Sequence, residues 1–219
     1  MADVVSFFTK DFDQKKSLKS IQLLFKQAGK IRENQIKIQL ISHYSSSGIP
    51  KNYNNMLSDT LMMAFAKYGK LIQEKHFSKL DKNLKKIKSK ISRISEKDYR
   101  RYLGFKKLSI KESITHSTFS RKQLHVQRKE LKSFYYAKQL MKNKKQKNYM
   151  RQMKNITEKL GKWHDCILLS NHLRHYVRTT PLSIKEKRQL QTIIGKIKPE
   201  SEIYLVEIKS LFQAYSETC

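Results

Sequence analysis

Residues 157–176 read TEKLGKWHDCILLSNHLRHY, and residues 25–44 read FKQAGKIRENQIKIQLISHY. Aligning Gly29 with Gly161 pairs lysine with lysine, an acidic residue with an acidic residue, and a final His-Tyr with a final His-Tyr. Such self-similarity is typical of a duplicated half that cannot bury its apolar face alone. The sequence therefore predicts two related halves about a pseudo-twofold axis. A chance likeness between two basic helices is the alternative.

The spacing of apolar residues predicts an all-α fold with long helices. Only 6 glycines and 3 prolines occur in 219 residues, and apolar positions recur at intervals of three and four along nearly the whole chain. The row from Leu61 to Ile94 predicts one or two long helices. Strand-like alternation is absent from the sequence.

Three stretches predict breaks between helices: SSSGIPKN at 45–52, the region of Gly104, and TTPLS at 179–183. In the last of these, Thr180 or Ser183 is expected to cap the helix that follows. That final helix is predicted over residues 184–215, with an interruption near Gly195 or Pro199.

The charge balance points to a polyanionic partner. The chain has 47 Lys and Arg against 18 Asp and Glu, a formal net charge of +29, while 38% of its residues are hydrophobic. The composition is too apolar for a disordered tail. Because so large a charge of one sign repels itself, we expect these residues to bind a polyanion: nucleic acid, an anionic membrane surface or polyphosphate.

Cysteine usage and the hydropathy pattern predict a cytoplasmic protein without disulfides. The two cysteines are Cys166 and Cys219, too few for a disulfide framework. The first residues, MADVVSFFTKDFD, lack the basic start and long apolar core of a signal peptide. No stretch approaches the roughly 20 apolar residues of a membrane span.

The two glycines in the repeated stretches predict a helix that stops and restarts. At a restart, free backbone N–H groups and the helix dipole attract anions. Lys30, Arg32 and Lys162 stand beside these positions, so they are candidate phosphate ligands. The alternative is that the bases are solvated and the acidic residue after each is an ordinary first-turn residue.

A second basic feature lies within residues 121–132, where Arg121, His125, Arg128 and Lys132 follow one another at i, i+4, i+7 and i+11. This spacing places them on one helix face. A separate apolar stripe predicts that the same helix buries its other side; the stripe consists of Leu124, Leu131, Phe134, Tyr135 and Met141. A solvated charge run is the alternative to a binding face.

These residues resemble the CHAD domain, the conserved histidine α-helical domain. His125, Arg128 and Lys132 match its helix of the form His-x-x-Arg-x-x-x-Lys/Arg. Residues 28–33 and 160–165 match its second signature, Leu-Gly-x-x-Arg-Asp followed by hydrophobic residues. The resemblance covers roughly the whole chain.

The resemblance implies a single CHAD-like domain over residues 1–219, built as two pseudo-symmetric four-helix-like bundles with halves at 1–108 and 109–219. It also implies inorganic polyphosphate bound in a basic groove between the halves, without catalysis or a cofactor, and association with polyphosphate granules. The implied ligands are Lys30, Arg32, Arg121, Lys122, His125, Arg128, Lys129, Lys132, Lys162 and His164.

The sequence departs from the family pattern in its first half. The counterpart of His125 would fall before Met1, so the first basic helix is missing and an apolar face is expected to be exposed. We therefore expect a homo-oligomer. Glu33 replaces the aspartate of the signature, and His164 replaces its arginine.

Other functions are weaker matches. His164, Cys166, His172 and His175 are spaced poorly for one metal ion, so no metal site is predicted. No P-loop, carboxylate pair or Ser-His-Asp signature indicates an enzyme. An RNA- or DNA-binding protein is the main alternative, because a lysine-rich face spans 79–101 and two aromatic and basic clusters could stack bases; the clusters are 99–102 and 134–136. A scaffold or granule-associated protein that is localised by its charge is the third candidate function.

Overall fold

The computed structural model describes residues 2–9, 12–45, 48–73, 76–141 and 147–218. These residues form helices and no strand, which confirms the all-α prediction. None of the described helices is apolar enough over a sufficient length to cross a membrane. The helices are α1 (Ala2–Phe8), α2 (Gln14–Tyr44), α3 (Lys51–Gln73), α4 (His76–Ile91), α5 (Glu96–Thr115), α6 (Arg121–Gln139), α7 (Lys147–Thr179) and α8 (Ile184–Thr218).

Two of the predicted breaks are confirmed. The chain leaves α2 and re-enters a helix at Lys51, and it leaves α7 and re-enters at Ile184. Ser183 caps α8, because its Oγ accepts from the backbone N–H of Glu186 at 3.2 Å and lies 3.2 Å from that residue's Oε2. The Ser183 hydroxyl donates to this carboxylate oxygen, which holds the side chain in its capping position.

The interruptions predicted at glycine and proline are wrong. Gly104 lies inside α5, and both Gly195 and Pro199 lie inside α8. Gly29 and Gly161 likewise lie inside α2 and α7, so neither repeated stretch contains a helix stop and restart. An interior glycine costs about 1 kcal/mol of helix stability. Burial of a single large apolar side chain contributes more than this, so packing carries the helices through.

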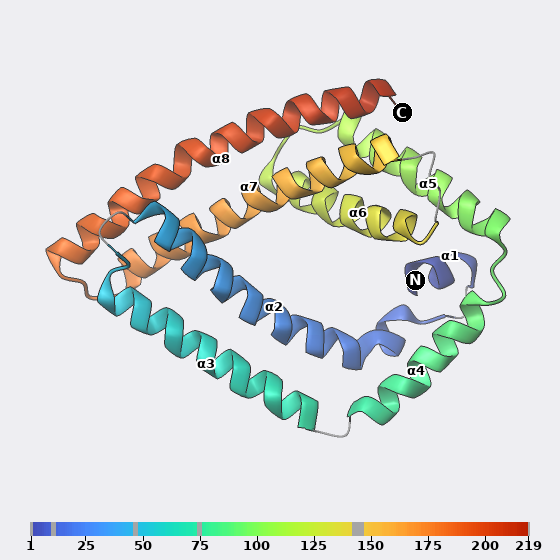
Figure 1. The fold of residues 1–219 in the computed structure, drawn as a ribbon, viewed down its shortest axis with the longest axis horizontal. Coiled ribbons are helices and arrows are strands. Elements are labelled where there is room, and N and C mark those ends of the chain that lie inside the picture. The colour runs from blue at the N-terminus through green and yellow to red at the C-terminus, as the bar shows by residue number, and fades with distance from the viewer. Residues whose placement is uncertain (1, 10–11, 46–47, 74–75, 142–146, 219) are drawn as a thin grey trace. The chain divides into compact units, whose positions relative to one another are not determined.

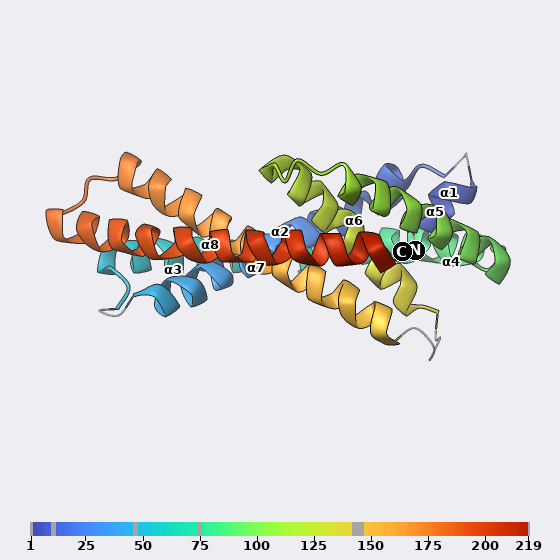
Figure 2. The same ribbon diagram turned by 90° about the horizontal axis from the view of Figure 1, so that it is seen from above.

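The chain divides into two compact units, residues 1–102 and 103–219. In the second unit α7 packs along α8, and α6 packs on α7; the crossing of α7 and α8 is visible in Figure 2. Buried side chains from these helices form its core; among them are Leu124, Leu131, Phe134, Ile156, Leu160, Leu169, Ile193, Ile197 and Phe212. The duplication, and halves meeting at residue 108, stay predictions.

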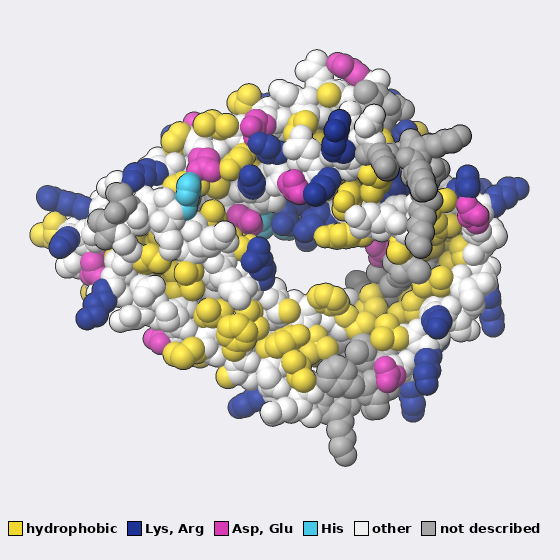
Figure 3. Space-filling model, viewed as in Figure 1, with side chains coloured by type: hydrophobic (Ala, Val, Ile, Leu, Met, Phe, Trp, Pro, Cys, Tyr) yellow, Lys and Arg dark blue, Asp and Glu magenta, His cyan; other side chains and the backbone are white. Residues whose placement is uncertain are grey.

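In the first unit α2 packs on α3 and α4, and α1 contacts α4 (Figure 1). The buried side chain of Gln27 donates to the carbonyl of Ala64 at 3.0 Å and so ties α2 to α3. Hydrophobic side chains are exposed over α2 and α3 in the view of Figure 3; they include Leu23, Phe25, Met62, Met63 and Phe65. Self-association stays a prediction.

Of the two cysteines, Cys166 is a buried free thiol, and Cys219 lies outside the described residues.

The continuity of α2 gives a test of the fold. Gly29 is exposed inside the helix, and an added Cβ would meet nothing within 4 Å. Gly29→Ala should therefore raise the free energy of unfolding by about 0.5–1 kcal/mol. Gly48 is the control, because its φ of +84° disfavours alanine, and Gly48→Ala should lower stability by about 1 kcal/mol. Urea unfolding followed by circular dichroism measures both. A destabilised Gly29→Ala variant would contradict a continuous α2.

Candidate anion-binding site

Helix α6 is held on α7 by the apolar stripe that its sequence predicted. Leu124 and Leu131 are fully buried and Phe134 nearly so, while Tyr135 is half-buried. Ser120 begins the helix as its N-cap, its side chain accepting from the backbone N–H of Gln123. Because one side of α6 is fixed on α7, the residues beside the stripe lie along the edge of this contact.

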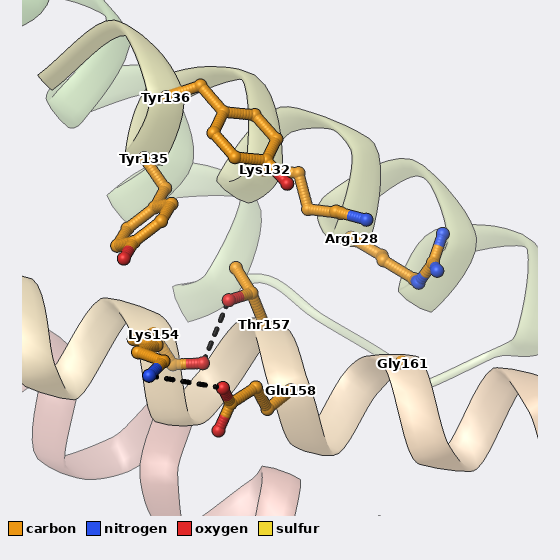
Figure 4. Close-up of a pocket in the computed structure, with 8 residues that line it drawn as sticks. All are labelled: Arg128, Lys132, Tyr135, Tyr136, Lys154, Thr157, Glu158 and Gly161. Carbon is orange, nitrogen blue, oxygen red and sulfur yellow. Dashed lines mark hydrogen bonds and ion pairs between the residues drawn. The ribbon is translucent and has the colours of Figure 1, made fainter. Parts of the chain in front are cut away.

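The two helices run antiparallel, and their register pairs specific residues. The rings of His125 and His164 stack, with centroids 5.2 Å apart and planes inclined by 21°. Further along the pair, Arg128 lies across from Gly161 (Figure 4). Each step toward the C-terminus of α6 is thus matched by a step toward the N-terminus of α7.

A pocket of about 320 Å³ opens beside this contact. Its lining comes from α6 and α7; the residues are Arg128, Lys132, Tyr135, Tyr136, Lys154, Thr157, Glu158 and Gly161. Figure 4 shows the side chains of Arg128 and Lys132 next to each other, above α7. Two members of the predicted basic row, Arg128 and Lys132, therefore form one wall of a cavity.

The two cations of this wall are partly removed from water. The Nε of Arg128 is buried and has no hydrogen-bond partner. Burial lowers the pKa of Lys132, the charge of Arg128 lowers it further, and Asp165 acts in the opposite direction. An anion in the pocket would lie beside both side chains and favour the charged form of Lys132.

The stacked pair of His125 and His164 lies outside the pocket lining. Burial lowers the pKa of His125, and the neighbouring Lys129, His164 and Arg128 lower it further. The Nδ1 of His164 is also buried without a hydrogen bond; it lies 3.6 Å from Oδ1 of Asp165. An anion beside His125 would favour its protonated form.

Gly161 keeps the space in front of Arg128 open. An added Cβ at this position would meet nothing within 4 Å, and the residue lines the pocket. Packing therefore does not require a glycine here. Its effect is that no side chain stands between the pocket and the guanidinium.

The other predicted ligands of α6 do not line the pocket: Arg121, Lys122 and Lys129 are exposed, and His125 is half-buried. His164 of α7 does not line it either. The structure also separates Lys162 from the pocket. Its Nζ lies 6.0 Å from the centre of the Tyr204 ring of α8.

Lys30 and Arg32 are exposed residues of α2 in the first unit. Because α2 and α7 are continuous, the predicted phosphate site at a helix restart is wrong for Lys30, Arg32 and Lys162. The interior backbone N–H groups of a helix already bond to carbonyls one turn earlier, so none is free for a phosphate.

The sequence interpretation missed the α7 wall of the pocket. Lys154 and Glu158 form an i,i+4 pair, with Nζ 3.7 Å from Oε1, and Thr157 donates to the carbonyl of Lys154. Their i,i+4 spacing was readable, but their position opposite Lys132 depends on the α6–α7 register. Among the described residues, no three His, Cys, Asp or Glu side chains gather as a metal site.

Comparison with protein-family models, curated proteins and solved structures returned no match.

The lowered pKa of His125 predicts a pH-dependent stability. The unfolded chain binds a proton near pH 6.5 and the folded protein only below it, so stability falls as the pH drops below about 6.5. His125→Gln should remove part of this loss, by a few tenths of a kcal/mol for a solvent-screened group. Urea unfolding at about pH 7.5 and about pH 5.5 measures it. His116→Gln, an exposed imidazole of the same unit, is the control; an unchanged difference in His125→Gln would contradict the assignment.

Proposed function

We propose that this chain binds inorganic polyphosphate without catalysis, as an all-α protein of the CHAD type built from two duplicated helical bundles. Phosphate groups bind at the α6–α7 pocket, where Arg128 and Lys132 supply the positive charge. His125, stacked on His164 outside the lining, adds charge when it is protonated. The observation that carries the proposal is the pair of adjacent cations, Arg128 and Lys132, on one wall of a pocket whose single lining carboxylate, Glu158, is paired with Lys154.

Geometry and charge support an oxyanion as the ligand. The guanidinium is a planar donor suited to two oxygens of one phosphate, and ionised hydrogen bonds of this kind are the stronger ones. Lys132 lies one helical turn along α6, so adjacent phosphates of a flexible chain can contact both residues. The net charge of +29 attracts such a chain from a distance.

A second candidate, binding of RNA or DNA, is favoured by the same net charge. Phosphate contacts by lysine and arginine carry most of the affinity of non-specific nucleic-acid binding. The two functions differ in what they require at the pocket. Polyphosphate needs only the cations, whereas a nucleic acid must also place ribose and bases along α6.

Removal of the cationic wall tests the proposal. Replacing His125, Arg128 and Lys132 by Gln should weaken polyphosphate binding by well over tenfold, because partly desolvated cations contribute about 1 kcal/mol or more each. The control replaces Lys85, Lys86 and Lys88 of α4, which are exposed. It removes at least as much charge but should cost only a few-fold, since exposed charges are screened.

Both triple variants are titrated with polyphosphate at about 0.15 M salt, after circular dichroism has confirmed their helicity. Equal losses in the two variants would favour diffuse attraction over a site. Competition with single-stranded RNA at the same phosphate concentration separates the two functions. RNA that displaces polyphosphate at lower concentration would favour the nucleic-acid function.

A steric variant tests the same pocket without changing charge. Gly161→Leu places a side chain in the open space before Arg128, and it should lower polyphosphate affinity about tenfold, as for one lost ionised hydrogen bond. The control is Gly195→Leu in α8, where an added Cβ also meets nothing within 4 Å. Unaltered binding by Gly161→Leu would contradict a site at this pocket.

A further inference from the structure

The end of the pocket away from Arg128 is aromatic. Tyr135 and Tyr136 follow Lys132 on α6, with ring centroids 5.7 Å apart and planes inclined by 64°. Figure 4 shows both rings at one end of the pocket and Arg128 at the other. Tyr136 is 57% exposed, so its ring is available to a ligand. Phosphate binding alone does not use these rings.

The charges of the pocket are distributed unevenly. Glu158 is the single carboxylate among the pocket-lining residues, and it pairs with Lys154 at 3.7 Å. Figure 4 places Lys154 below Tyr135. The charge of Lys154 is therefore offset by a carboxylate, whereas Arg128 and Lys132 have no such partner in the lining. A ligand that fits this pocket has negative charge at one end and an uncharged planar group at the other.

The spacing along α6 matches such a ligand. With a rise of about 1.5 Å per residue, Tyr136 lies roughly 6 Å from Lys132 along the axis, and Tyr135 lies roughly 10 Å from Arg128. In a nucleotide, one ribose separates the base from the first phosphate, and each further phosphate extends away from the base. A base on the tyrosines would therefore place the first phosphate near Lys132 and a terminal phosphate near Arg128.

The geometry points to a nucleoside di- or triphosphate as the ligand of this pocket, with its base stacked on Tyr136 and its phosphates on Lys132 and Arg128. The inference rests on the phosphate binding proposed above and adds a group that inorganic polyphosphate lacks. The volume of about 320 Å³ is at the lower end for a site that encloses one small molecule. This favours a mononucleotide over a nucleic-acid strand.

Calorimetry of the full chain with ATP and with inorganic tripolyphosphate tests the inference, at about 0.15 M salt with EDTA present. ATP carries no more charge than tripolyphosphate, so tighter binding measures the nucleoside. We expect ATP to bind about tenfold tighter, the size of one base stacked on an aromatic side chain. Tyr136→Ala should remove this advantage and leave tripolyphosphate affinity unchanged, while Tyr136→Phe should retain it.

The control is Phe105→Ala on α5, which removes a residue also 57% exposed but outside the pocket; it should bind both ligands as the unaltered protein does. Saturation-transfer NMR adds a measurement that needs no variant, because protons of a stacked base should receive saturation from the protein.

The possible results separate the two proposals. Equal affinities for ATP and tripolyphosphate, both lost in Arg128→Gln, would overturn the nucleotide inference and leave phosphate binding intact. Binding of neither ligand would overturn both proposals. Tighter binding of a short RNA without terminal phosphates, with the same dependence on Tyr136, would overturn the assignment to a mononucleotide.

Discussion

The packing of α6 against α7 is the constraint on which the candidate site depends. Helical periodicity places the apolar stripe of α6 on one side of the helix. Burial of this stripe against α7 determines which residues lie at the edge of the contact. The helix face next to the stripe carries His125, Arg128 and Lys132, so these residues lie at that edge. The antiparallel register then selects their neighbours on α7, bringing His164 to His125 and Gly161 to Arg128.

The positions of these cations lower the stability of the folded protein and at the same time favour binding of an anion. Burial and neighbouring cations lower the pKa values of His125 and Lys132, which means that the folded protein disfavours the charged forms. The buried Nε of Arg128 adds a donor without an acceptor. An anion in the pocket would favour the charged form of Lys132, so binding and stability are coupled at that side chain.

The fold was largely predictable because its signals are local. The spacing of apolar residues predicted the helices, and Ser183 predicted the start of α8. The predicted interruption at Gly161 was wrong for a physical reason: propensity at one residue is outweighed by burial along a helix as long as α7. The α7 wall of the pocket was not predictable, because the position of Glu158 relative to Lys132 depends on a register that neither helix specifies alone.

The glycine that occurs in both repeated stretches has different surroundings in α7 and in α2. In α7, Gly161 stands opposite Arg128, and the absent side chain gives an anion access to the guanidinium. In α2, Gly29 is equally open, but near this level α3 presents the carbonyl of Ala64, which accepts from Gln27. Of the two glycines, Gly161 is the one that lines the pocket beside Arg128. An interior glycine weakens a helix by about 1 kcal/mol, and in the proposed site anion binding next to Arg128 offsets this loss at Gly161.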